Sequence, residues 1–158
     1  MKNTFKRSGA ALISLVLLLV LAVSAGAASS QNVGVKFWKE RSDKESMANS
    51  GINPDRTATL TRQANGTYTL TLPVMQVSKL GVTGYLSGLT IGDVTYDGTL
   101  TGDFNKATAV LTIKNLPASV LTGSDVNKSV LVTCNIQMDL QVLGEINTSA
   151  RMCIWNQK

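Results

Sequence analysis

The sequence predicts an all-β domain of about eight short strands with one short helical turn, arranged as a sandwich or a small barrel. Three observations carry this prediction. Segments of alternating apolar and polar residues recur along the chain, and a two-residue period is typical of strands with one buried face. Turn-forming residues separate these segments at close spacing. After the first 28 residues, no segment shows a sustained 3.6-residue apolar period.

A secretory signal peptide is predicted for residues 1–28, followed by one domain over residues 29–158. Lys2, Lys6 and Arg7 supply positive charge, Ala10 to Val23 form an apolar run, and Ala25-Gly26-Ala27 is a small-residue cleavage site. An uncleaved membrane anchor is the alternative, because the apolar run approaches spanning length. The small residues favour cleavage, so we expect a secreted or loosely cell-wall-associated product without stable membrane insertion.

Composition and charge exclude several classes of protein. Three of the 15 cationic residues lie in the leader and all ten acidic residues lie outside it, so the mature chain carries +2 rather than +5. Its Lys and Arg residues are scattered, without the clustered basic stripe that nucleic-acid binding requires. Histidine is absent, which removes the commonest general base and zinc ligand. We therefore expect neither an enzyme nor a nucleic-acid-binding protein.

The first half of the mature chain predicts a strand, a helical turn and a hairpin. Val33 to Trp38 is the first strand, and Ser46 to Ser50 is a helical turn capped by Ser46. Thr57 to Arg62 and Thr67 to Leu72 then flank Ala64-Asn65-Gly66. A three-residue loop with a left-handed Gly66 pairs Leu60 with Leu70 and keeps both apolar faces together, whereas a two-residue turn would scramble them.

The sequence in the middle of the chain predicts a distorted strand and, after it, a second pair of adjacent strands. Gly81 to Leu89 contains three glycines, which indicates a bulge where another segment approaches the backbone closely. Val94 to Thr101 and Lys106 to Ile113 form the pair. Asp93, Asp97 and Asp103 lie near one another in sequence, but each has a glycine beside it, so we interpret them as turn residues rather than a calcium site.

The C-terminal stretch predicts a long hairpin that contains both cysteines. Apolar residues occupy every even position from Val130 to Val142, and after a turn-like break at Leu143 to Asn147 the alternation resumes in Ala150, Met152 and Ile154. An exported chain with two cysteines is expected to be oxidised. A two-residue turn at Leu143-Gly144 sets Cys134 opposite Cys153, which predicts a disulfide.

The same register conflicts with the apolar pattern, because it turns Ala150, Met152 and Ile154 away from the face of Cys134. A one-residue bulge in the final strand would reconcile the two. The alternative is that both faces of the hairpin are covered, one by the core and one by a ligand or by the Ser46 turn.

Short motifs along the chain resemble those of the NEAT (near iron transporter) family of Gram-positive bacteria. The resemblance covers most of Val33 to Trp155, and the motifs that carry it are Ser46-Met47-Ala48-Asn49, Asn65-Gly66-Thr67-Tyr68-Thr69-Leu70, Gly81-Val82-Thr83-Gly84-Tyr85-Leu86 and Ala150-Arg151-Met152. It implies an immunoglobulin-like β-sandwich that holds haem in a groove between the helical turn, Ser46 to Ser50, and the last hairpin, Ile136 to Trp155.

The resemblance also implies a set of haem-pocket residues. Ser46 and Met47 belong to the helical turn, Arg151 is a partner for a haem propionate, and Met152 or Met47 is a candidate axial ligand through its thioether. The family's Tyr-x-x-x-Tyr motif on the final strand is missing, since the tyrosines are Tyr68, Tyr85 and Tyr96. The function that the resemblance implies is haem or haemoprotein binding for iron acquisition. The alternative, which the missing tyrosine motif supports, is a ligand-free immunoglobulin-like surface or adhesion module.

Overall fold

The structure, a computed structural model, describes residues 28–79, 81–139 and 144–158. The predicted leader lies outside these ranges except for its last residue. In the described residues the strands are β1 (Ser29–Lys39), β2 (Ala58–Arg62), β3 (Tyr68–Pro73), β4 (Val77–Lys79), β5 (Val82–Ile91), β6 (Val94–Thr101), β7 (Val110–Leu116), β8 (Val130–Met138) and β9 (Glu145–Asn156). Three 3-10 helices accompany them: η1 (Met47–Gly51), η2 (Ala118–Val120) and η3 (Val126–Lys128). None of the helices in these ranges is long and apolar enough to cross a membrane.

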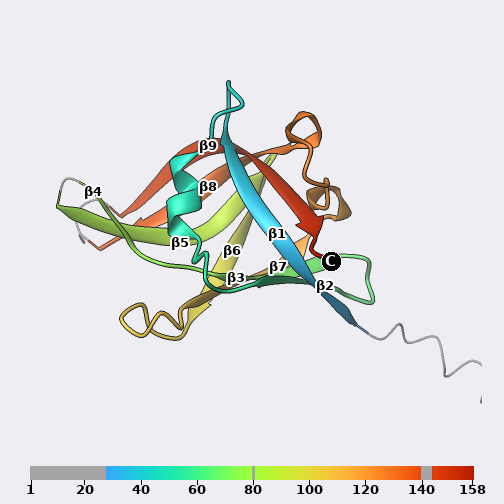
Figure 1. Ribbon diagram of the computed structural model, residues 1–158, viewed down its shortest axis with the longest axis horizontal. Helices are drawn as coiled ribbons and strands as arrows, with labels where there is room; N and C mark the ends of the chain where they lie inside the picture. The colour runs from blue at the N-terminus through green and yellow to red at the C-terminus, as the bar shows by residue number, and fades with distance from the viewer. Residues whose placement is uncertain (1–27, 80, 140–143) are drawn as a thin grey trace, which may run out of the picture.

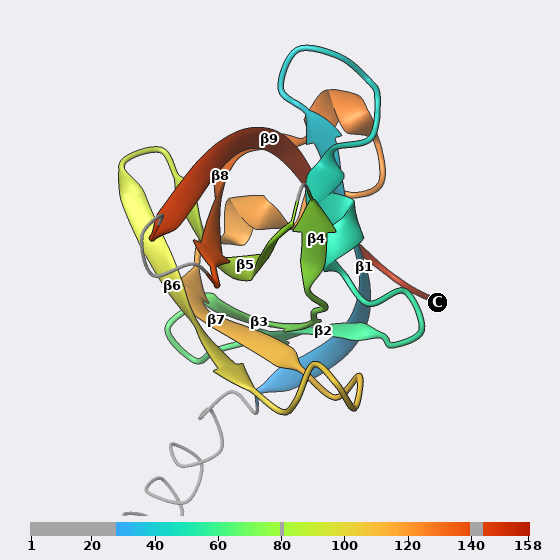
Figure 2. The ribbon, with the colours of Figure 1, turned by 90° about the vertical axis from the view of Figure 1, so that its left-hand side faces the viewer.

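The strands form one sheet that closes on itself (Figure 1). Its order is β4-β5-β6-β7-β3-β2-β1-β9-β8, and β5 also pairs with β8, so eight strands make a ring and β4 extends one side of β5. Figure 2 shows this ring, with β4 and η1 next to each other at one side. The all-β prediction is confirmed, and of the two predicted arrangements, a sandwich or a small barrel, the described strands form one closed, barrel-like sheet.

A bulge in β5 accompanies the closure. The register between β5 and β8 shifts between Leu86 and Gly88, as the glycine-rich sequence predicted. A Cβ atom at Gly88 would lie 2.7 Å from the carbonyl oxygen of Tyr96 on β6, closer than a side chain allows. Gly88 therefore lets β6 and β8 pair with the two edges of the same bulged strand.

The first predicted hairpin is confirmed in register and turn. Leu60 of β2 pairs with Leu70 of β3, and Gly66 has a φ of +82°, the left-handed conformation that the three-residue loop requires. Several boundaries differ from the prediction, among them that of β7, which is Val110–Leu116 and not Lys106 to Ile113. β1 begins at Ser29 and β9 begins at Glu145, so most of the predicted break at Leu143 to Asn147 belongs to a strand.

The interior of the ring is a continuous apolar core. Its largest fully buried side chains come from β1, β2, β3, β5, β7 and β9 and include Phe37, Leu60, Leu70, Leu72, Leu89, Leu111, Ile113, Met152 and Ile154. Burial of such side chains stabilises each by about 1.5–3 kcal/mol relative to exposure. Leu86 of β5 belongs both to this core and to the lining of the pocket described below.

Candidate functional site

An apolar pocket of about 340 Å³ lies between η1, β5 and the β8–β9 hairpin. Ile136 and Met138 of β8 and Ile146 and Thr148 of β9 form one wall. Ile136 pairs directly with Ile146, and Cys134 pairs with Thr148. Even-numbered residues of both strands thus share one face, which belongs to the core from Val130 to Cys134 and to the pocket beyond it.

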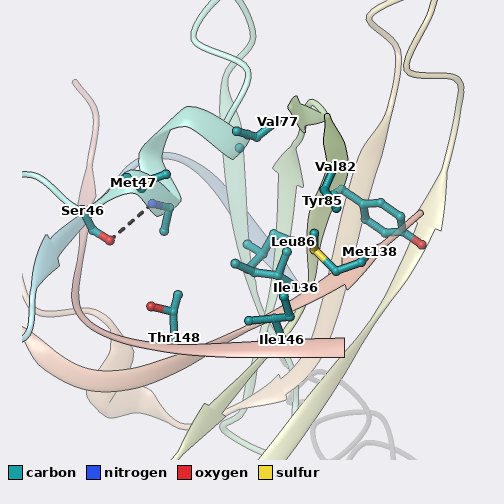
Figure 3. A pocket seen from close by; sticks show the side chains of 13 residues that line it. Ser46, Met47, Val77, Val82, Tyr85, Leu86, Ile136, Met138, Ile146 and Thr148 are labelled. Atoms are coloured by element: carbon teal, nitrogen blue, oxygen red, sulfur yellow. Dashed lines mark hydrogen bonds between the residues drawn. The ribbon is translucent and has the colours of Figure 1, made fainter. Parts of the chain in front are cut away.

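The second wall comes from the first half of β5, where Val82, Gly84 and Leu86 line the pocket. A Cβ atom at Gly84 would lie 2.8 Å from Sδ of Met138 and 3.0 Å from the carbonyl oxygen of Gln137. The missing side chain therefore creates a notch that the Met138 thioether occupies. Figure 3 shows this sulfur beside Leu86 at the pocket.

The cover of the pocket is η1, which contributes Ser46, Met47 and Ala48. The Ser46 hydroxyl caps the helix by accepting a hydrogen bond of 3.3 Å from the Ala48 N–H. The Asn49 side chain binds the backbone of Phe37 twice: its Oδ1 accepts from the N–H at 2.8 Å and its Nδ2 donates to the carbonyl at 2.7 Å. These bonds fix η1 against β1 over the pocket.

The far end of η1 is also held. Met75 donates its N–H to the Gly51 carbonyl at 3.0 Å, and Ile52 forms a single antiparallel bridge with Val74. The helix is therefore bonded to β1 through Asn49 and to the connection between β3 and β4 through Gly51 and Ile52. Its exposed side chain, Met47, is 57% accessible at the pocket mouth.

The pocket-lining residues carry no formal charge. Its lining side chains are aliphatic, thioether or hydroxyl groups, with the ring of Tyr85 at one side. That ring packs against Phe104 at 5.2 Å between centroids, with a tilt of 47°, and in Figure 3 its hydroxyl points away from the pocket. Among the described residues, no group of three or more His, Cys, Asp or Glu side chains could hold a metal ion. The arrangement suits a largely apolar ligand.

Of the residues predicted for the site, Ser46 and Met47 line this pocket, whereas Arg151 does not. Arg151 Nη2 contacts Asp43 Oδ1 at 2.7 Å and the Ser42 carbonyl at 2.9 Å, and Nε donates to the Lys39 carbonyl at 3.1 Å. An odd position in β9 directs this side chain to the outer face, where it ties down the loop after β1. In this structure Arg151 therefore holds the loop after β1 and does not border the pocket.

Met152 is likewise not at the pocket. It is fully buried in the core and pairs with Phe37 on β1 and Val130 on β8. The apolar alternation predicted the face on which Met152 lies, but it did not predict that this position of β9 belongs to the core and not to the pocket. Met138, Gly84 and Ile146 line the pocket but were not among the individual residues predicted for the site, although the alternation from Val130 to Val142 already put Met138 on the correct face.

The predicted disulfide is corrected too, since Cys134 and Cys153 are both free and buried. Cys134 pairs with Thr148, and Cys153 lies five positions further along β9, about 17 Å away at strand spacing. The two thiols also face opposite sides: Cys134 belongs to the core, and Cys153 Sγ lies 3.5 Å from the Asp125 carbonyl outside it. Burial raises the pKa of Cys134 to about 12, which keeps this thiol neutral.

Two solved structures share this fold. The NEAT5 domain of IsdX2, a hemophore of B. anthracis, in complex with haem, aligns with a TM-score of 0.53 and 11% sequence identity over 84% of this chain and 99% of that chain. A mutant of the same NEAT5 domain, also in complex with haem, aligns with the same TM-score and identity over 84% of this chain and 98% of that chain. No family model matches the chain, and no curated protein matches it. The chain therefore has the fold of the NEAT domains, as the sequence resemblance implied.

Proposed function

We propose that this chain is a secreted module that binds haem for iron acquisition, with the pocket between η1 and the β8–β9 hairpin as its binding site. The observation that carries the proposal is the uncharged, apolar pocket that opens under η1, at the place that the resemblance to haem-binding domains implies. The haem complexes of one NEAT5 domain and of its mutant, which share this fold, support it. We take the module to be a binder rather than an enzyme.

The residues of the pocket fit the porphyrin ring of haem. Ile136, Ile146, Val82 and Leu86 offer aliphatic surface on two facing walls, and removal of apolar ring surface from water contributes about 25 cal/mol per Å². Charged residues are absent from the lining, so the two propionates would be left to the solvent at the mouth. When bound, haem would supply the iron that the module captures. Donors for that iron are limited to thioethers and hydroxyls, and we therefore expect modest affinity.

Titration with haemin, followed by the Soret absorbance, tests the proposal. Ile146 is 43% exposed at the mouth of the pocket, so Ile146→Glu leaves the fold intact while it places a carboxylate against the ring. We expect this change to weaken binding by about tenfold or more, which corresponds to about 1.4 kcal/mol. Leu131→Glu is the matched control, because Leu131 is 57% exposed on the outer face of β8.

Unchanged haemin absorbance with wild-type protein, together with no binding to a haemoprotein such as haemoglobin, would reject the proposal. That result would favour the alternative of a ligand-free surface or adhesion module. Equal weakening by both glutamate variants would also count against the pocket, because it would show that the site does not lie on the inner face of the hairpin.

A further inference from the structure

We infer that Met138 is the side chain that faces the iron in this pocket, and that the module consequently binds ferrous haem in preference to ferric haem. The inference rests on the proposed function and deepens it, because it names the oxidation state of the ligand. It starts from the placement of one sulfur atom and from the donors that the lining lacks.

The Met138 thioether is held in a defined position. Its Sδ occupies the notch at Gly84, 2.8 Å from where a Cβ atom would stand, and the side chain is only half-buried because it borders the pocket. Met138 also anchors the end of β8, where its N–H donates to the Gly144 carbonyl at 3.1 Å. A donor atom on a strand that is bonded on both sides is pre-positioned for a ligand that enters beside it.

The other donors at the pocket are less suitable. The Ser46 hydroxyl already accepts the Ala48 N–H, and the Tyr85 hydroxyl points away from the pocket (Figure 3). Met47 is 57% exposed on the cover, so its side chain borders solvent. Thr148 offers a neutral hydroxyl from the opposite wall. No imidazole, carboxylate or thiolate belongs to the lining.

The chemistry of a thioether determines the preference. Sulfur in methionine is a soft, neutral donor that suits metals of lower charge, whereas hard anionic oxygen donors suit ferric iron. Among haem proteins, methionine ligation raises the reduction potential, which means that it stabilises the ferrous state relative to the ferric state. A pocket with a thioether and without an anionic donor therefore selects reduced haem.

Paired titrations under anaerobic conditions test the inference, with ferric haem and with haem reduced by dithionite. The readout is the ratio of the ferric to the ferrous dissociation constant, which we expect to exceed one for the wild-type protein. Met138→Leu retains volume and apolar character and should lower the ratio by about tenfold, equivalent to about 59 mV for a one-electron couple. Met75→Leu is the control, because Met75 is 41% exposed and does not line the pocket.

The outcomes separate the inference from the proposed function. Metal-free protoporphyrin IX needs no axial ligand, so it should bind wild type and Met138→Leu equally. A wild-type ratio of one or less, or a ratio that Met138→Leu leaves unchanged, overturns the inference while porphyrin binding still supports the function. A ratio lowered by Met47→Leu instead of Met138→Leu also overturns it. Failure of every porphyrin to bind the wild type rejects both.

Discussion

The Asn49 side chain is the attachment that holds η1 over the pocket, and its removal gives a measurable loss of stability. β1 pairs with β2 only from Ser29 to Val33, so at Phe37 the same edge of β1 has no strand beside it. The Asn49 amide takes that place through its bonds of 2.8 and 2.7 Å to the Phe37 backbone. Asn49→Ala removes both bonds at once.

The size of the effect follows from what remains after the substitution. The Phe37 carbonyl keeps the Ser46 N–H at 3.0 Å, whereas the Phe37 N–H loses its protein partner. An unsatisfied buried donor costs about 1–3 kcal/mol, and the second lost bond contributes about 0.5–1.5 kcal/mol. We expect the free energy of unfolding to fall by about 2 kcal/mol and, because η1 is loosened, haem affinity to fall as well.

Urea denaturation followed by tryptophan fluorescence measures this change, with Asn127→Ala as the matched control. Asn127 belongs to η3, and its Nδ2 donates to Asp125 Oδ1 at 3.1 Å in an exposed position, so its loss should cost less than about 0.5 kcal/mol. Equal stabilities for the two alanine variants would refute the reasoning, because they would show that the Asn49 bonds do not hold η1 in solution.

Three further predictions concern the cysteines and one glycine. Alkylation of the denatured, unreduced protein should add two alkyl groups by intact mass, and an unmodified protein would reveal the disulfide that the structure lacks. The raised pKa of Cys134 keeps its thiol neutral in the folded protein at a pH where the thiol of the unfolded chain ionises. The contribution of this thiol to the free energy of unfolding is therefore complete below about pH 8.5 and declines towards pH 12. The wild type should therefore lose about 1–2 kcal/mol more than Cys134→Ala between about pH 7.5 and pH 10, and parallel urea midpoints would contradict this. Gly34→Ala should cost about 1–3 kcal/mol, since its Cβ would overlap the Trp155 ring. The loss should shrink in a Trp155→Leu background, and additive losses would argue against the clash.

Local patterns in the sequence were sufficient to predict which face of a strand is buried and how a short hairpin pairs. The alternation along β8 predicted which residues face inward, and turn chemistry at Gly66 predicted the pairing of Leu60 with Leu70, which is confirmed. Both features depend on neighbours within a few residues. The closure of the sheet depends instead on pairing between β5 and β8, which are distant in the sequence, and no local pattern specifies that contact.

The sequence did not predict how deep along the ring a residue lies, nor the register of the β8–β9 hairpin. Met138 and Met152 share one apolar face, yet Met138 lines the pocket and Met152 is fully buried. The position of the core along the strands decides between them, and it depends on closure of the ring. The prediction of a disulfide was wrong for a related reason. The prediction assumed a two-residue turn at Leu143-Gly144. In the structure the Met138 N–H donates to the Gly144 carbonyl, and in this register Cys134 lies opposite Thr148.

Mapping of amide chemical shifts on addition of metal-free protoporphyrin IX tests most directly that the apolar pocket is the binding site. This ligand is diamagnetic and independent of any iron ligand. We predict that perturbed amides cluster in η1, in residues 82–86 of β5, and around Met138 and Ile146 in the last hairpin. Perturbations centred on the polar hollow beside Asn65 and Lys114, or no saturable perturbation, would contradict the account.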